Sequence, residues 1–124
     1  MKKGDEYMIN SVCVLTIKVD NIQAAIDFYT NVLDFNVSKY YGEKIVSLQH
    51  EAVPIVLEET EHQLLGNRQG VLLGLLSQDI EQDFSQLKAK GVKVLFDEPK
   101  PCPPGRYFVI EDPSRNEIEL VQFL

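Results

Sequence analysis

Few side chains in this sequence have both the type and the setting that chemistry requires. The closing stretch DPSRNEIELVQF, residues 112–123, reads as a tight turn followed by a strand, and Glu119 stands on that strand among apolar neighbours. An acid in such a position can ligate a metal ion, exchange a proton or pair with a cationic ligand. We therefore treat Glu119 as the candidate catalytic and binding residue and ask which partners the chain can bring to it.

The histidines and cysteines do not form a recognisable set around it. His50 and His62 are the two histidines of the chain, and neither belongs to an HExxH motif. Both lie at turn ends or in the acidic stretch HEAVPIVLEETEHQ, so we interpret them as solvated loop side chains. Cys13 and Cys102 lack CxxC spacing, which argues against a disulfide framework. We expect Cys13 to pack within its apolar run and Cys102 to be a loop thiol.

The composition excludes several classes of function. The 124 residues, 44% hydrophobic and 25% charged, indicate one soluble globular domain spanning 1–124. A net charge of -7 with 12 basic residues leaves no basic stripe for phosphates, so we expect no nucleic-acid binding. No apolar run reaches the roughly 18 residues that cross a bilayer, and the start MKKGDEYMIN has no apolar signal region. We therefore expect a cytoplasmic location and no membrane partner, and the acidic balance favours a neutral or cationic ligand.

The first half of the chain has a clear order of elements. The run VCVLTIKV, residues 12–19, is typical of a strand, and the apolar spacing that begins at Ile22 predicts a helix capped by Asp20 or Asn21. Three short strand-like runs follow, FNVSKYY, KIVSLQ and VPIVLEE. The first unit, about residues 9–60, therefore has the order β-α-β-β-β.

The second unit, about residues 70–124, repeats that order after the turn GNRQG. The run VLLGLLS precedes a helix with Ile80, Phe84 and Leu87 on its apolar side, and Gly91 is suited to its C-terminal cap. KVLF, RYFVIE and EIELVQF supply three more strand patterns, and CPPGR reads as a rigid turn between them. The doubled order is the main organisational feature of the chain.

A constant offset supports the repeat. Ile80 follows Ile22 by 58 residues, and the same offset places Leu72 on Val14. Two such units are most simply joined into an α+β fold in which one curved eight-stranded mixed sheet surrounds a concave cup, with the helices outside. Alternation along the first strand turns Val14 and Thr16 toward that cup.

Two phrases carry a resemblance to a known family. IKVDNIQAAIDFYTNVLDFNV is similar to a strand, acid, helix and FYxxVLGF pattern, and FVIEDPSRNEIELVQF is similar to a DPxGNxIEL ending. With the doubled unit, they resemble the vicinal oxygen chelate superfamily, the group of glyoxalases, bleomycin-resistance proteins and extradiol dioxygenases. Asp34 and Arg115 stand where the family pattern has glycine. We therefore expect two turns made by residues that tolerate them less well.

The resemblance implies a metal site that this sequence does not complete. Metalloenzymes of the family carry one ligand on the first strand and one on the last strand of each unit. The corresponding residues here are Val14, Val56, Leu72 and Glu119. A zinc, nickel or iron ion needs at least three protein donors at about 2 Å, and three of these side chains are aliphatic. We therefore expect no metal cofactor, and a divalent metal held by shifted ligands, such as Glu58, is the alternative.

Without a metal, the cup becomes a binding site. An apolar cup with a few polar groups suits a small molecule, and a carboxylate placed there can bind a cationic group. Aromatic side chains on the strands can stack on a flat ligand. The candidate ligand-binding residues are Thr16, Tyr41, Ser47, Gln49, Arg106, Tyr107 and Glu119.

Three functions remain open at this point. The preferred one is a metal-free small-molecule binder of the bleomycin-resistance type, which sequesters a cationic or aromatic ligand without a reaction. The second is an enzyme, a lyase, isomerase or dioxygenase that uses shifted metal ligands or acid/base chemistry by Glu119. The third is an interaction or regulatory protein whose cup is filled. The resemblance also implies a homodimer, which open sheet edges favour.

Overall fold

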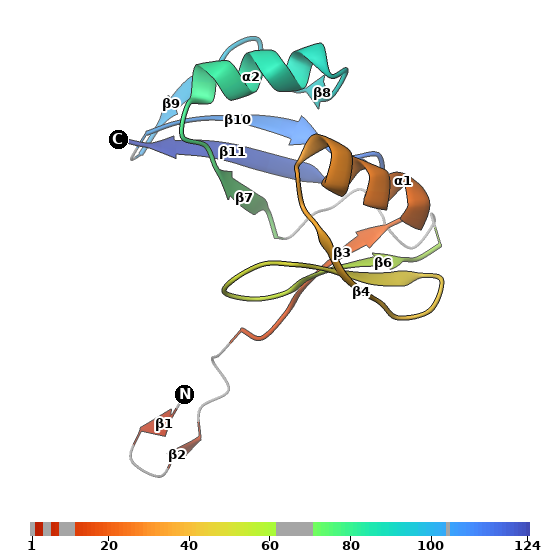
Figure 1. Cartoon of the computed structure of the whole chain (residues 1–124). Coiled ribbons are helices and arrows are strands. Elements are labelled where there is room, and N and C mark those ends of the chain that lie inside the picture. Colours follow the sequence, from red (N-terminus) through yellow and green to blue (C-terminus); the bar gives the residue numbers. More distant parts are fainter. Residues whose placement is uncertain (1, 4–5, 8–11, 62–70, 104) are drawn as a thin grey trace.

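The structure is a computed structural model that describes residues 2–3, 6–7, 12–61, 71–103 and 105–124 (Figure 1). His62 and the turn GNRQG lie outside these ranges. Within them, no helix is both long enough and apolar enough to cross a membrane.

The first unit forms with the predicted order of elements. Its elements are β3 (Leu15–Val19), α1 (Ile22–Asp27), the π-helix η1 (Phe28–Val32), β4 (Val37–Tyr40), β5 (Ile45–Leu48) and β6 (Ile55–Glu59). Asn21 is the N-cap of α1, and its side-chain oxygen accepts a hydrogen bond from the backbone N–H of Ala24 at 2.9 Å. The strands pair in the order β3-β6-β5-β4, with β3 parallel to β6.

The second unit repeats this arrangement. Its elements are β7 (Leu73–Leu76), α2 (Ile80–Ala89), β8 (Lys93–Val94), β9 (Lys100–Cys102), β10 (Gly105–Glu111) and β11 (Glu117–Phe123). Asp79 caps α2, and Gly91 beyond its end has a φ of 83°. The strand order β7-β11-β10-β8, with β7 parallel to β11, matches the order of the first sheet. The α+β class and the doubled β-α-β-β-β unit are therefore confirmed.

The strands of the two units are divided between two sheets. A four-stranded sheet belongs to the first unit and a five-stranded sheet to the second, and among the described strands no backbone ladder joins them. Figure 1 shows α2 over β10 and β11, and α1 between the second sheet and the first. The single eight-stranded sheet expected from the sequence is thus two mixed sheets, because the units meet through α1 and the core.

Two short pairings were not expected. Ahead of the first unit, β1 (Lys2–Lys3) pairs antiparallel with β2 (Glu6–Tyr7). β9 pairs with β10, so Cys102 lies in a strand and not in a loop, and Pro103 after it lies in a turn. Prolines at 99 and 101 hid this strand, since proline is tolerated only at the edge of a sheet.

Buried side chains of both units form one core. Phe84 on α2 packs edge-to-face on Phe108 of β10, with ring centroids 5.1 Å apart. Tyr29, at the start of η1, is fully buried in the same cluster. Cys13 does not join it: the thiol is exposed because β3 begins only at Leu15, so the expectation of packing was wrong.

The turn 112–116 fastens the two units together. Asp112 is only 4% exposed, and its Oδ2 accepts a hydrogen bond from the Tyr29 hydroxyl at 3.0 Å. The Ser114 hydroxyl donates to Asp20 at 2.9 Å, and the Asn116 side-chain amide donates to the carbonyl of Lys18 at 2.8 Å. Asp112, Ser114 and Asn116 of the DPSRN phrase are therefore structural residues that link the two units.

Two non-glycine residues adopt the conformation that the resemblance predicted. Asp34 has a φ of 64° and Arg115 a φ of 69°. Both lie in the left-handed region, where a side chain is usually disfavoured. Asp34 and Arg115 therefore form the turns for which the family pattern has glycine.

Candidate functional site

Glu119 lies in a row of residues that crosses the second sheet. Gly74 on β7 and Val109 on β10 are its direct neighbours. The side chain is half-buried, and its Oε1 lies 3.5 Å from the position that a Cβ would take at Gly74. A side-chain carbon at position 74 would be in ordinary van der Waals contact with the carboxylate, so Gly74 borders Glu119 directly.

The first sheet contains the equivalent row without a carboxylate. Val56 on β6 pairs with Thr16 on β3 and with Ser47 on β5, as Glu119 pairs with Gly74 and Val109. Val56 is thus the counterpart of Glu119 in the other unit. The nearest acid along β6, Glu58, lies opposite Lys18 and forms a salt bridge with it at 2.8 Å.

These residues do not fit a metal ion. Val14 and Leu72, just before β3 and β7, are 43% and 47% exposed aliphatic side chains. In the described ranges, no group of three or more His, Cys, Asp or Glu side chains is placed to hold a metal. His50 lies in the loop after β5, where its Nδ1 is 2.9 Å from the carbonyl oxygen of Val53. Since a single carboxylate cannot hold a catalytic zinc, nickel or iron ion, we derive no step through one.

The Glu119 carboxylate has no protein partner among the residues that the structure describes. Two cationic side chains are engaged elsewhere, because Lys18 pairs with Glu58 and Arg106 pairs with Glu81 on α2. A half-buried acid without a donor favours binding of a positively charged or hydrogen-bond-donating group. The carboxylate is therefore available to a ligand.

The other predicted site residues fall into two groups. Thr16 on β3 and Ser47 on β5 belong to the first sheet. The exposed Tyr41 follows directly after β4, and Lys39 Nζ lies 5.0 Å from the centroid of its ring. Gln49 follows β5 and is exposed. In one chain, these residues lie on a different sheet from Glu119.

Tyr107 alone of the predicted residues shares the face of Glu119. It lies two residues from Val109 on β10 and packs edge-to-face on Phe96, with centroids 5.1 Å apart. Arg106 alternates with it and reaches the opposite face, where α2 lies. The structure therefore separates Arg106 from Glu119.

Apolar side chains surround Glu119 on an open surface, which we call the Glu119 face. Leu76 follows Gly74 on the same face of β7 and is 65% exposed, and Phe123 at the end of β11 is 58% exposed. Sequence reasoning missed Gly74 and Phe123 as site residues. The alternation in EIELVQF already places Phe123 on the side of Glu119, so a signal for it was present.

Comparisons with known proteins agree with this fold. The family model described as Glyoxalase/Bleomycin resistance protein/Dioxygenase superfamily matches residues 9–120. Comparison with curated protein sequences gave no match.

Several solved structures share the fold at low identity. TnmS3, an antibiotic binding protein from Streptomyces sp. CB03234, is 24% identical, with a TM-score of 0.76 over 95% of this chain and 100% of that one. A glyoxalase/bleomycin resistance protein/dioxygenase from Nocardioides is 16% identical, with a TM-score of 0.77 over 96% and 87%. The fosfomycin resistance protein FosX from Listeria monocytogenes is 19% identical, with a TM-score of 0.75 over 94% and 96%.

Proposed function

We propose a metal-free binding function for this chain, which belongs to the Glyoxalase/Bleomycin resistance protein/Dioxygenase superfamily. The observation that carries the proposal is the half-buried Glu119 carboxylate, which has no partner in the described ranges. The equivalent position in the first unit is the aliphatic Val56. Such a site recognises a ligand by charge and shape and supplies no Lewis acid.

The ligand class follows from the chemistry of the Glu119 face. The carboxylate favours a cationic group, while Leu76, Tyr107 and Phe123 offer apolar and aromatic surface. We therefore expect a cationic molecule with a flat, apolar body. The description of TnmS3 as an antibiotic binding protein and of FosX as a fosfomycin resistance protein supports a role in small-molecule sequestration or resistance.

A second copy of the chain completes the cup in this proposal. The Glu119 face is open and apolar, with Leu72, Leu76 and Phe123 all more than two-fifths exposed. In the equivalent row of the first sheet, Thr16 is exposed and Ser47 is only 7% exposed. In a homodimer, the first sheet of one copy would close the Glu119 face of the other, so that the two groups of candidate residues meet at one ligand.

A second candidate function is acid/base catalysis without a metal. The absence of a hydrogen bond or ion pair on Glu119 in the described ranges favours it, since a general base must be accessible to its substrate. In such an isomerase, the carboxylate would remove a proton from one substrate atom and return it to another. Chemical change of a bound compound, lost in Glu119→Gln, would support this function over sequestration.

Calorimetric titration of compounds selected by thermal shift from a panel of cationic aromatic molecules tests the binding proposal. We expect Glu119→Gln to lower the binding affinity for a selected compound at least about tenfold, or about 1.4 kcal/mol of binding free energy, because one charge-assisted contact is lost. The control is Glu43→Gln, which removes one charge from an exposed turn. Equal affinity in wild type and Glu119→Gln would overturn the assignment of Glu119.

A further inference from the structure

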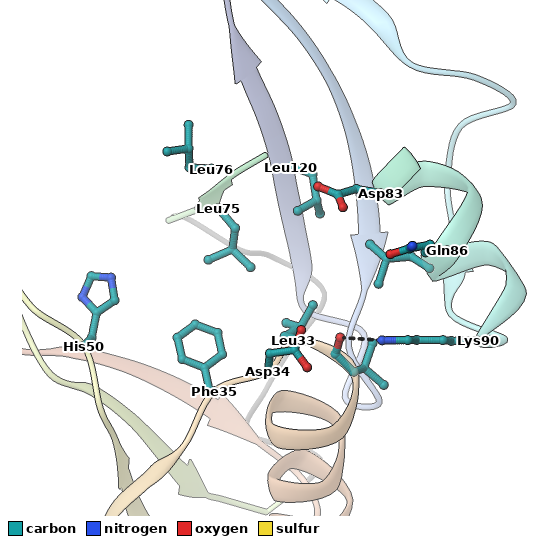
Figure 2. A pocket seen from close by; sticks show the side chains of 12 residues that line it. Leu33, Asp34, Phe35, His50, Leu75, Leu76, Asp83, Gln86, Lys90 and Leu120 are labelled. Carbon is teal, nitrogen blue, oxygen red and sulfur yellow. Dashed lines mark hydrogen bonds between the residues drawn. The ribbon is translucent and has the colours of Figure 1, made fainter. Parts of the chain in front are cut away.

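A cavity lies on the side of the second sheet opposite to Glu119. It has a volume of about 370 Å³ and lies between the end of η1, β7 and α2 (Figure 2). Leu75 and Leu120 contribute to its apolar lining. They alternate with Gly74 and Glu119 on β7 and β11, so they project from the opposite face of the sheet. This junction cavity therefore lies on the opposite side of the sheet from Glu119, and Leu76 at the end of β7 borders both the cavity and the Glu119 face.

The backbone is irregular where it borders the junction cavity. The π-helix η1 ends there, with the N–H of Leu33 donating to the carbonyl of Phe28 at 3.2 Å. Asp34 follows with its φ of 64° and is one of the lining residues. π-Helical turns and left-handed non-glycine residues gather at functional sites, where their strain is retained for a purpose. Glycine at 34 would form the same turn without strain, so the retained carboxylate needs its own explanation.

The polar groups at the rim leave Asp34 without a partner among the described residues. Asp83 accepts a hydrogen bond from the Ser77 hydroxyl, and Lys90 Nζ lies 3.5 Å from the carbonyl oxygen of Val32. His50 and Gln86 complete the polar lining. The carboxylates of Asp34 and Asp83 outnumber the single ammonium group of Lys90, so the rim has a net negative charge.

The lining has two chemical parts. Phe35, Leu75 and Leu120 offer apolar surface, and Figure 2 shows Asp34 next to Phe35 at the same opening. Pockets of roughly 300 Å³ and more, with apolar walls and a few polar groups, are typical of small-molecule sites. An apolar body with one ammonium group matches both parts of the lining.

We propose that the junction cavity is a second ligand site, which binds a small amphipathic amine with its apolar body on Phe35, Leu75 and Leu120 and its ammonium group on Asp34. The site goes beyond the proposed function of the Glu119 face, because it uses the opposite face of the sheet and none of the same carboxylates.

The test is a nitrogen-15 NMR titration of the full chain with benzylamine, with benzyl alcohol and benzoate as neutral and anionic counterparts. We expect benzylamine to shift the amide signals of Leu33, Asp34, Leu75 and Gln86, and the two counterparts to bind at least about fivefold more weakly. Equal binding of the alcohol or the anion would overturn the assignment of an amine site.

Two variants of Asp34 separate binding from folding. Asp34→Asn keeps the size and tolerates a positive φ, and Asp34→Gly relieves the strain, so both are expected to fold. Benzylamine affinity should fall at least about fivefold in both, and it should be unchanged in Asp97→Asn, which removes an exposed loop charge. Gln86→Trp, substituted from an exposed helix position, should fill the cavity and abolish binding.

Three results would contradict the junction site. They are the absence of benzylamine binding, unchanged affinity in Asp34→Asn, and shifts confined to β11 and β7 residues of the Glu119 face that disappear in Glu119→Gln. The last result would place the amine on the Glu119 face, so it would support the proposed function while overturning the second site.

Discussion

At the residue scale, Arg115 adopts a left-handed backbone conformation that is unfavourable for a residue with a side chain. The residue has a φ of 69°, and its N–H donates to the carbonyl of Asp112 at 2.9 Å. A residue with a side chain in the left-handed region loses roughly 1–2 kcal/mol of stability. Replacing it by glycine recovers only part of this, because glycine has more conformational freedom in the unfolded state.

Arg115→Gly should therefore stabilise the protein by about 1 kcal/mol, measured by urea unfolding. Arg115→Ala serves as the control, because it removes the guanidinium and keeps the strain. A gain in Arg115→Ala equal to that in Arg115→Gly would show that the guanidinium, and not the backbone, is responsible.

Asp112 links stability to pH. Burial raises the pKa of its carboxyl above the ordinary value of 3.8, while the hydrogen bond from the Tyr29 hydroxyl acts in the opposite direction. Because the folded state holds this proton more tightly than the unfolded state, the contribution of Asp112 is most favourable below pH 3.8 and is lost as pH rises.

Tyr29→Phe removes a donor from the buried carboxylate, so it should destabilise the protein by about 1–3 kcal/mol at pH 7. The loss should be smaller near pH 3, where Asp112 is protonated in both states. Urea unfolding at the two pH values checks this, with the exposed Tyr40→Phe as control. A cost that is equal at both pH values would contradict the assigned role of the Tyr29 hydroxyl.

At the element scale, each helix begins in the same way in both units. Asn21 and Asp79 accept hydrogen bonds from the third residue beyond them, and the first helical amides donate to side chains of the last strands. Ile22 N–H donates to Glu59 at 2.8 Å, and Ile80 N–H donates to Gln122 at 2.8 Å. The repeat therefore includes the capping of the helices.

Asp79→Ala should cost about 1 kcal/mol of stability, because one helix N–H loses its acceptor. Asp79→Asn, which retains a side-chain oxygen, should restore most of it. Thermal unfolding followed by circular dichroism measures both. Equal losses in the two variants would show that the cap acts through charge alone.

Sequence periodicity was sufficient for most elements and for part of the site. The apolar spacing and the cap predicted α1 from Ile22. The 58-residue offset identified Val14 and Leu72 as equivalent positions in the two units. β9 was missed because the prolines at 99 and 101, beside and within it, are typical of turns. Arg106 was grouped with Glu119, although its alternation on β10 turns it to α2, where Glu81 pairs with it. Which residue pairs with Arg106 depends on contacts between elements that are distant in sequence. The local sequence pattern carries no information on those contacts.

At the scale of the whole molecule, the two units are joined on the helix side and open on the Glu119 face. Tyr29 and Asp112 hold one side together. On the other side, Leu72 and Leu76 are 47% and 65% exposed, which is a poor surface for an isolated chain. We therefore expect a homodimer that covers this face.

Leu76→Asp should convert the dimer to a monomer, because it places a charge in the covered apolar surface. Light scattering after size-exclusion chromatography measures the mass, and circular dichroism should be unchanged, since the residue is exposed in the single chain. Ser85→Asp on the exposed side of α2 is the control. A monomeric wild type, or a variant that stays dimeric, would contradict this interface.

The central claim is that the Glu119 face works without a metal. The most direct measurement is elemental analysis of untagged protein prepared without chelators, with wild type and Glu119→Ala side by side. The account predicts far less than one zinc, nickel or iron ion per chain in both proteins, because one carboxylate is too few donors. One ion per chain in the wild type that disappears in Glu119→Ala would contradict it.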